Sequence, residues 1–128
     1  MISDQLNLPL KIFDSFTERK LGAWNGQRAE ITNALLAAGE TPPGGESKGD
    51  FEQRITKAFL AMAPLCAQWP LLVSSRGVAR VLLEKVKFEN ASQFPNGGLA
   101  KVALKDPDSF EIVKLEYLNL PEPAGADA

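Results

Sequence analysis

Residues 71–78, with the sequence LLVSSRGV, hold the pattern from which we predict the fold. The run Leu71–Ser74 is apolar and of strand length, which is typical of a strand buried on both faces, as in a parallel sheet. Ser75–Gly77 reads as a turn, and Val78, Val81 and Leu82 then recur at helical spacing. We therefore predict a strand, a turn and a helix that packs on the sheet of that strand.

The residues before this unit predict two helices. Ser47 precedes Asp50 by three positions, a variant of the capping box, and therefore marks a helix start. The apolar residues that follow it at helical spacing are Phe51, Ile55, Ala58, Phe59, Met62 and Leu65. A shorter helix is expected over Gln27–Ala38, with Gly39 just past its end.

Three further strands are expected outside the helices. Leu8–Phe13 is apolar and contains a proline, which favours an edge strand. Leu99–Leu104 and Phe110–Leu118 are joined by the turn Asp106–Ser109, which predicts a C-terminal β-hairpin. We expect one domain over residues 1–120, followed by a flexible tail over 121–128 without an apolar anchor.

Length and composition favour a single soluble domain. The chain has 128 residues, of which 45% are hydrophobic and 23% charged. A net charge of -2 offers nothing that attracts nucleic acid or an anionic membrane, so we expect neither as a partner. The first residues lack the pattern of a signal peptide, and no apolar run is long enough to span a bilayer. The expected location is the cytoplasm.

The chain contains no histidine, which limits its chemistry. Without imidazole there is no Ser-His-Asp or Cys-His catalysis, no phosphohistidine and no histidine-ligated metal. Cys66 is the single cysteine, is expected to be buried and unreactive, and suits a reducing compartment. Gly44-Gly45 lacks the ending of a nucleotide-binding loop, and we expect no cofactor and no metal.

Several motifs, taken in order, resemble one family. They are Glu18-Arg19-x-x-Gly22-x-Trp24-x-Gly26, Gly45-Glu46-Ser47-x-x-Asp50-x-x-x-Arg54, Val73-Ser74-Ser75-Arg76-Gly77-Val78-x-Arg80 and Asn96-Gly97-Gly98. Together they are similar to the histidine phosphatase superfamily, also called phosphoglycerate-mutase-like proteins. The resemblance implies an α/β fold, a three-layer α/β/α sandwich, with phosphate bound at the carboxyl ends of parallel strands.

The departures from the family pattern concern its histidines. The resemblance implies an Arg-His-Gly motif on a first, central strand, and this sequence starts after the corresponding position. A second family histidine aligns with Ser75. We therefore expect a chain truncated at the N-terminus, lacking the usual first central strand and both histidines. Either the Leu71–Ser74 strand pairs directly with Leu99–Leu104, or a homodimer closes the gap, and the homodimer is favoured.

The resemblance also implies where a phosphate site would lie. Glu18 corresponds to the family's acid/base carboxylate and would be a relic of it. The candidate phosphate ligands are Arg19, Ser74, Ser75, Arg76, Gly77 and Asn96. A simpler interpretation of Ser75 and Arg76 is a helix cap followed by an exposed arginine. Arg54 and Arg80 are expected to be solvated or ion-paired surface residues.

These observations lead to a functional hypothesis with alternatives. The main hypothesis is a catalytically degenerate domain, a pseudoenzyme, with a binding or assembly role and a phosphate or small phosphorylated ligand. The alternative is a residual phosphohydrolase that uses Glu18 with a water and Arg19, Ser75 and Arg76 as anion donors. A third interpretation is that the chain is the surviving part of a longer reading frame without a selected role.

Overall fold

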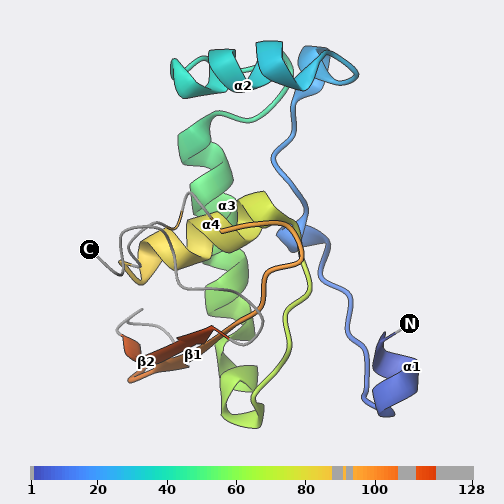
Figure 1. Cartoon of the computed structure of the whole chain (residues 1–128), viewed down its shortest axis with the longest axis vertical. Coiled ribbons are helices and arrows are strands. Elements are labelled where there is room, and N and C mark those ends of the chain that lie inside the picture. The colour runs from blue at the N-terminus through green and yellow to red at the C-terminus, as the bar shows by residue number, and fades with distance from the viewer. Residues whose placement is uncertain (1, 88–90, 92–93, 107–111, 118–128) are drawn as a thin grey trace.

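The central element of the computed structural model is helix α3, Lys48–Met62, which α4, Arg76–Lys85, crosses (Figure 1). The structure describes residues 2–87, 91, 94–106 and 112–117. Both helices begin where a serine caps them. The Ser47 hydroxyl accepts a hydrogen bond from the Asp50 N–H at 3.0 Å, so the predicted cap and helix are confirmed. Ser75 caps α4 in the same way through the Val78 N–H at 3.4 Å.

The main core lies where these two helices meet. Ile55 of α3 and Val78 of α4 are fully buried, because each presents its apolar face to the other helix. Phe16 joins them from the 3-10 turn η1, Asp14–Phe16. The other buried members of this cluster are Phe51, Ala58, Met62 and Val81, which confirms the predicted apolar face of α3.

A second cluster attaches the strands to the opposite side of α4. Strand β1, Ala100–Leu104, pairs antiparallel with β2, Ile112–Tyr117, with an irregularity between Ala103 and Leu104. Strands were expected at both places. The buried residues that join the strands to α4 are Leu83, Val86, Ala91 and Phe94. The predicted turn at 106–109 lies mostly outside the described residues, and the tail at 121–128 lies wholly outside them.

Two predicted strands are not formed. Leu71–Ser74 and Leu8–Phe13 carry no regular secondary structure, and the predicted burial of the first on both faces is wrong, since Leu71 is 53% and Val73 is 73% exposed. An apolar run has strand propensity, but a strand needs a neighbour to complete its hydrogen bonds, and none lies beside either run among the described residues. For the same reason α4 packs on α3 and β1, and not on a parallel sheet.

Helix α2, Ala29–Ala37, forms a lobe that stands apart from α3 and α4 (Figure 1). It lies within the predicted range, and Gly39 follows it with a φ of +83° as expected. The residue that this helix buries is polar. Ile31 is 49% exposed, whereas Thr32 is buried and its hydroxyl donates to the Ala29 carbonyl at 3.2 Å.

At the base of this lobe, the loop before α2 and the loop after it are joined by backbone hydrogen bonds. The Ala23 N–H donates to the Pro43 carbonyl and the Glu46 N–H to the Lys20 carbonyl, both at 2.8 Å. Gly22 has a φ of +52°, and a Cβ on it would overlap the backbone around Gly45. Only a residue without a side chain fits there.

The remaining short elements are helix α1, Ile2–Leu6, and two 3-10 segments, η2 at Gly22–Trp24 and η3 at Ala63–Gln68. The chain then leaves η3 through Trp69, whose φ is +52°. No helix in the described part of the chain is both long and apolar enough to cross a membrane.

Truncating the fully buried Ile55 tests the position of the core. Ile55→Ala should lower the free energy of unfolding by about 2–5 kcal/mol, because it removes buried methylene groups and leaves a cavity. Leu60→Ala, on the same helix but at a side chain that is 42% exposed, is the matched control and should cost clearly less. Urea unfolding followed by circular dichroism measures both. Equal losses for the two variants would contradict the described core.

Candidate functional site

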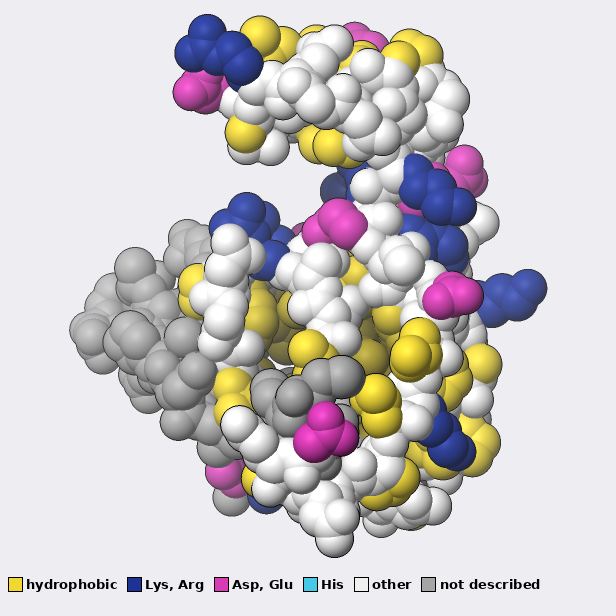
Figure 2. All heavy atoms as spheres, turned by 90° about the vertical axis from the view of Figure 1, so that its right-hand side faces the viewer, with side chains coloured by type: hydrophobic (Ala, Val, Ile, Leu, Met, Phe, Trp, Pro, Cys, Tyr) yellow, Lys and Arg dark blue, Asp and Glu magenta, His cyan; other side chains and the backbone are white. Residues whose placement is uncertain are grey.

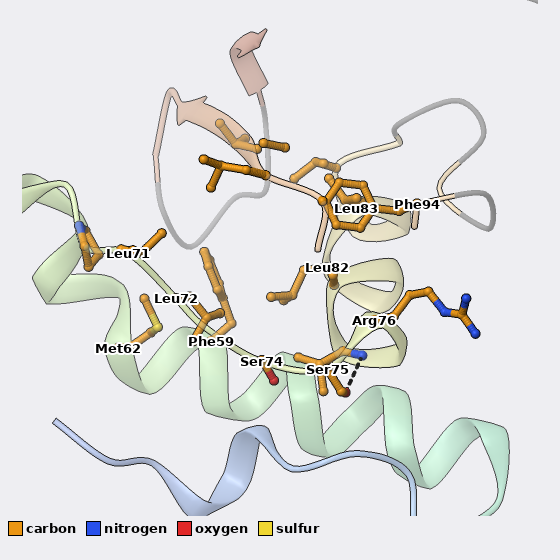
Figure 3. A pocket seen from close by; sticks show the side chains of 18 of the residues that line it. Phe59, Met62, Leu71, Leu72, Ser74, Ser75, Arg76, Leu82, Leu83 and Phe94 are labelled. Carbon is orange, nitrogen blue, oxygen red and sulfur yellow. Dashed lines mark hydrogen bonds between the residues drawn. The ribbon is translucent and has the colours of Figure 1, made fainter. Parts of the chain in front are cut away.

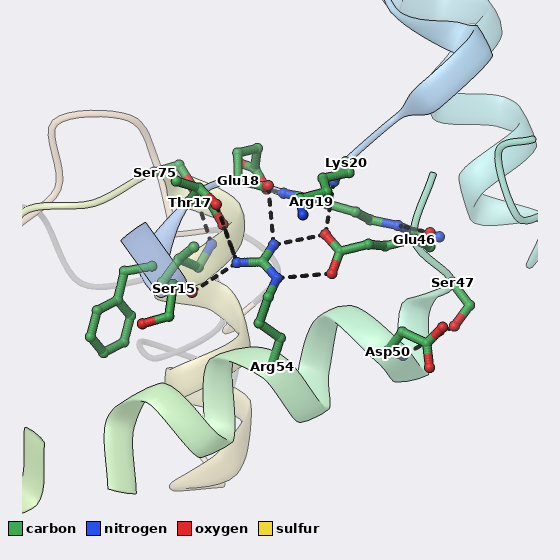
Figure 4. A network of polar contacts seen from close by, with 12 residues as sticks. Ser15, Thr17, Glu18, Arg19, Lys20, Glu46, Ser47, Asp50, Arg54 and Ser75 are labelled. Carbon is green, nitrogen blue, oxygen red and sulfur yellow. Dashed lines mark hydrogen bonds and ion pairs between the residues drawn. The ribbon is translucent and has the colours of Figure 1, made fainter. Parts of the chain in front are cut away.

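The most highly connected side chain among the described residues is that of Arg54, at the middle of α3 (Figure 4). Its Nε and Nη2 donate to the two carboxylate oxygens of Glu46 at 2.8 and 2.7 Å, a bidentate ion pair. Its Nη1 donates to the carbonyls of Ser15 and Thr17 at 2.8 and 3.0 Å. Its Nη2 also reaches the Glu18 carbonyl at 3.2 Å. The guanidinium therefore holds a whole loop against the helix.

Glu46 completes this network from the other side. Its carboxylate also accepts from the Lys20 N–H at 3.0 Å, and its carbonyl accepts from the Arg19 Nε at 3.0 Å. The hydrogen bonds from Arg54 hold the pKa of Glu46 at about 2, well below its usual 4.5. Burial opposes this shift but is the weaker effect. Glu46 is thus a structural anion, charged at all ordinary pH values.

The network places Glu18 at the start of α4. One Glu18 carboxylate oxygen accepts from the Arg19 N–H at 2.8 Å, and the other from the Gly77 N–H at 3.3 Å. A Cβ on Gly77 would overlap this carboxylate, so glycine is what lets it approach. A negative charge is stabilised at this end of the helix by the free N–H groups and the helix dipole. The Glu18 side chain thus occupies the position where the sequence predicts a bound anion.

A cavity of about 820 Å³ opens beside this point. Its wall includes Glu18, Ser75 and Arg76, which form a polar end at the start of α4, and the predicted residue Asn96 also lines it. The rest of the wall is mostly apolar, and side chains from α3, α4 and the segment after Trp69 point into it (Figure 3). The guanidinium of Arg76 extends away from these apolar side chains.

The other predicted ligands have different partners. Arg19 does not line the cavity, since its Nε is bonded to the Glu46 carbonyl. Ser74 lines the cavity, and its hydroxyl donates to the Phe16 carbonyl at 2.7 Å. Gly77 contributes its N–H to Glu18 rather than to the cavity wall. The Ser75 hydroxyl is used as the cap of α4, as the simpler interpretation expected.

The sequence pattern did not reveal the importance of Arg54, Glu46 and Arg80. Arg54 was expected to be a solvated or ion-paired surface residue, and it is ion-paired, but its side chain is only 21% exposed and that of Glu46 is 14% exposed. One sequence feature could have indicated this ion pair: Glu46 lies directly before the Ser47 cap, and Arg54 lies two turns into the same helix. Arg80, one turn after Arg76, has a buried Nε without a hydrogen-bond partner among the described residues. Burial, and then the charge of Arg76, lower its pKa.

The chemistry that this arrangement supports is electrostatic. Within the described ranges, no group of three or more histidine, cysteine or acidic side chains could hold a metal ion. Cys66 lines the cavity, and burial raises the pKa of its thiol, which disfavours the reactive thiolate. The polar end combines a carboxylate, a helix N-terminus and two nearby arginines, a set of groups that can bind an anion in exchange for Glu18.

Comparisons with known proteins agree with this fold. A family model described as histidine phosphatase superfamily (branch 1) matches residues 1–115. The crystal structure of the protein TTHB049 from Thermus thermophilus is similar, with a TM-score of 0.54 at 21% identity over 93% of this chain. A leucine-to-methionine variant of TTHB049 gives 0.52 at 20% identity over 91%. The chain spans 66% of the length of either structure. No curated protein matches the sequence.

The low pKa of Glu46 predicts how stability depends on pH. Because the folded pKa of about 2 is below the usual 4.5, the stabilisation is complete above pH 4.5 and is lost as the pH falls toward 2. Glu46→Gln should remove about 1–3 kcal/mol at neutral pH and flatten the acid limb of the stability curve. Urea unfolding from neutral to acid pH measures this.

Glu52→Gln is the control for that experiment. Glu52 pairs with Lys48 at 3.8 Å, and the lysine side chain is 74% exposed, so this pair contributes little. The stability curve of Glu52→Gln should fall at acid pH in the same way as that of the wild type. An unchanged acid limb in Glu46→Gln would show that the ion pair with Arg54 does not stabilise the fold.

Proposed function

This chain belongs to the histidine phosphatase superfamily, and from that membership we propose that it is a catalytically degenerate member that binds a phosphate-like anion without transferring phosphate. The superfamily has an α/β fold. Among the described residues of this chain the sheet is the antiparallel β1–β2 pair, and the three-layer α/β/α arrangement with a C-terminal hairpin stays a prediction. The 128 residues contain no histidine, so this chain cannot form a phosphohistidine. What it retains is the electrostatic part of a phosphate site.

One observation carries the proposal: the chain's own carboxylate lies at the N-terminus of α4. The Glu18 carboxylate accepts from the Gly77 N–H there, beside Arg76 and Ser75. A position that holds a carboxylate suits a phosphate oxygen equally well, because both are anions with acceptor oxygens. Arg80 adds positive charge one turn further along, with an Nε that has no partner among the described residues. Phosphate would displace Glu18 and gain the Gly77 N–H, with the positive charges of Arg76 and Arg80 nearby.

The residual phosphohydrolase is the weaker hypothesis. It needs Arg19 as an anion donor, yet the Arg19 Nε is committed to the Glu46 carbonyl. It also needs Glu18 to handle a proton, whereas the Glu18 carboxylate accepts hydrogen bonds from two backbone N–H groups. Loss of a covalent nucleophile costs several orders of magnitude in rate, which these remaining groups would have to replace.

The proposal also includes the cellular location and the partners of the domain. A single cysteine and a nearly balanced charge suit a cytoplasmic protein whose partners are neither nucleic acid nor membrane. A small phosphorylated molecule is the ligand class that the polar end of the cavity fits.

A thermal-shift titration with inorganic phosphate and 3-phosphoglycerate tests the anion site. We expect a saturable rise in Tm, because a ligand that binds only the folded state stabilises it. Glu18→Gln should tighten phosphate binding by about five- to thirtyfold, since it removes a like charge worth roughly 1–2 kcal/mol at this distance. Ser75→Asp should abolish the shift while keeping α4, since aspartate also caps helices.

Arg28→Ala is the matched control for charge. Arg28 lies on the α2 lobe and pairs with exposed Glu30, so its loss should leave the phosphate shift intact. Turnover of p-nitrophenyl phosphate that disappears in Glu18→Gln would support the phosphohydrolase instead. A phosphate shift that persists unchanged in Ser75→Asp would refute the placement of the site.

A further inference from the structure

The cavity beside α4 is much larger than a phosphate ion. Its volume of about 820 Å³ lies within the range of roughly 300–1,000 Å³ that is typical of sites for small organic molecules. The groups that would bind phosphate lie at one end of it, at the start of α4. A phosphate ion bound there would leave most of the space unfilled. The rest of the wall therefore indicates what else the ligand carries.

Charge in the described part of the wall is confined to the start of α4. Glu18 and Arg76 are the only charged side chains among the described lining residues. Further along the cavity, Phe59 of α3 and Leu82 of α4 point into the space between the helices and the strands (Figure 3). A ligand with one anionic end and an otherwise apolar body matches this distribution of charge.

A sugar phosphate matches the same wall poorly. Each of its hydroxyl groups would give up hydrogen bonds to water and face an apolar side chain that offers none in return, which weakens binding. An apolar carbon chain instead gains from burial, by up to about fourfold in affinity for each buried methylene group. The wall thus discriminates between these two classes of phosphomonoester.

Helix α4 runs alongside the cavity and gives a measure of its length. The lining residues of this helix extend from Arg76, at its first position, to Leu82 and then to Val86 just past its end. At about 1.5 Å per residue, Leu82 lies about 9 Å further along the helix axis than Arg76. A chain of about six carbons spans a similar distance, because each carbon–carbon bond of roughly 1.5 Å advances an extended chain by a little over 1 Å.

The apolar part of the wall also includes side chains that are open to solvent. Trp69 and Leu71 line the cavity and are 61% and 53% exposed. Apolar side chains also show at the surface of the molecule in the view of Figure 2. Exposed apolar surface beside a cavity is typical of a ligand-binding groove, because a ligand that covers it removes it from water.

We propose that the cavity binds a phosphomonoester whose organic part is an apolar chain of about six carbons, an inference that rests on the proposed phosphate site. The phosphate replaces the Glu18 carboxylate at the Gly77 N–H, and the carbon chain extends along α4 past Phe59 and Leu82. The ligand is thus selected by charge at the start of α4 and by apolar area further along the helix.

Isothermal titration calorimetry of the full chain with inorganic, methyl, butyl and hexyl phosphate tests this proposal. We expect the dissociation constant to fall about two- to fourfold for each added methylene group, so that hexyl phosphate binds at least about thirtyfold more tightly than methyl phosphate. 3-Phosphoglycerate should bind no more tightly than methyl phosphate, because its polar groups gain nothing from the apolar wall. Hexanol, which lacks the anionic end, should bind at least about tenfold more weakly than hexyl phosphate.

Two variants of one segment test where the carbon chain lies. Leu71→Asp places a charge in the cavity wall and should lower the ratio of hexyl phosphate affinity to inorganic phosphate affinity at least about tenfold. Val73→Asp is the matched control, since it adds the same charge two residues later at a side chain that does not line the cavity, and it should leave this ratio unchanged. The two side chains are 53% and 73% exposed, so both variants should fold normally.

The single thiol gives a second readout of the same cavity. Cys66 lines it, so saturating hexyl phosphate should slow the alkylation of Cys66 by iodoacetamide several-fold, whereas inorganic phosphate should not. An alkylation rate that hexyl phosphate leaves unchanged would overturn the proposed position of the carbon chain. So would an affinity ratio that Leu71→Asp leaves unchanged.

The remaining outcomes separate this inference from the proposed function. Equal affinities for methyl and hexyl phosphate would overturn the inference and leave the phosphate site in place. Hexanol that binds as tightly as hexyl phosphate would also overturn it, since the anionic end would then contribute nothing. Failure of every phosphate to bind, inorganic phosphate included, would contradict the proposed function itself and the inference with it.

Discussion

The structure depends on one ion pair, between Arg54 in the middle of α3 and Glu46 just before its start. A guanidinium has its donors in a fixed planar arrangement, so pairing with the carboxylate leaves the remaining N–H groups aimed at the loop carbonyls of residues 15, 17 and 18. These carbonyls belong to an irregular loop and not to a β-sheet, so Arg54 supplies the hydrogen-bond donors that a neighbouring strand would otherwise provide. Phe16 can then enter the core from an irregular segment.

This constraint passes from the core to the polar end of the cavity. Phe16 accepts a hydrogen bond from Ser74 through its carbonyl, and Glu18 accepts one from Gly77 through its carboxylate. The loop thus contacts α3 on one side and the start of α4 on the other. The position of the Glu18 carboxylate therefore depends on Arg54 and Ser74, which are far from it in the sequence. This is also why a side chain of the protein itself supplies the anion at the start of α4.

Helices α2, α3 and α4 and the two C-terminal strands could be predicted from the sequence, whereas the fate of the apolar run Leu71–Ser74 could not. Caps and apolar spacing are local, and Ser47 and the Phe51–Met62 face were both placed correctly because each depends on neighbours within a few positions. Leu71–Ser74 has the composition of a buried strand, but strand formation depends on a partner elsewhere in the chain. The candidate site shows the same division. The motif residues Glu18, Ser75 and Asn96 do meet at one cavity, but the choice of Glu46 as the partner of Arg19 is made by three-dimensional contacts that no local spacing specifies.

The contact between Gly22 and Gly45 bears on how this chain can be altered. Because the loops before and after α2 meet through their backbones, the whole stretch from residue 23 to residue 42 leaves the body and returns to it at nearly one point. Because the two ends of this stretch are adjacent, a short connection could replace it without moving the helices that form the core. The lobe is therefore the natural place for length variation, grafted peptides or a reporter domain, at a distance from the cavity.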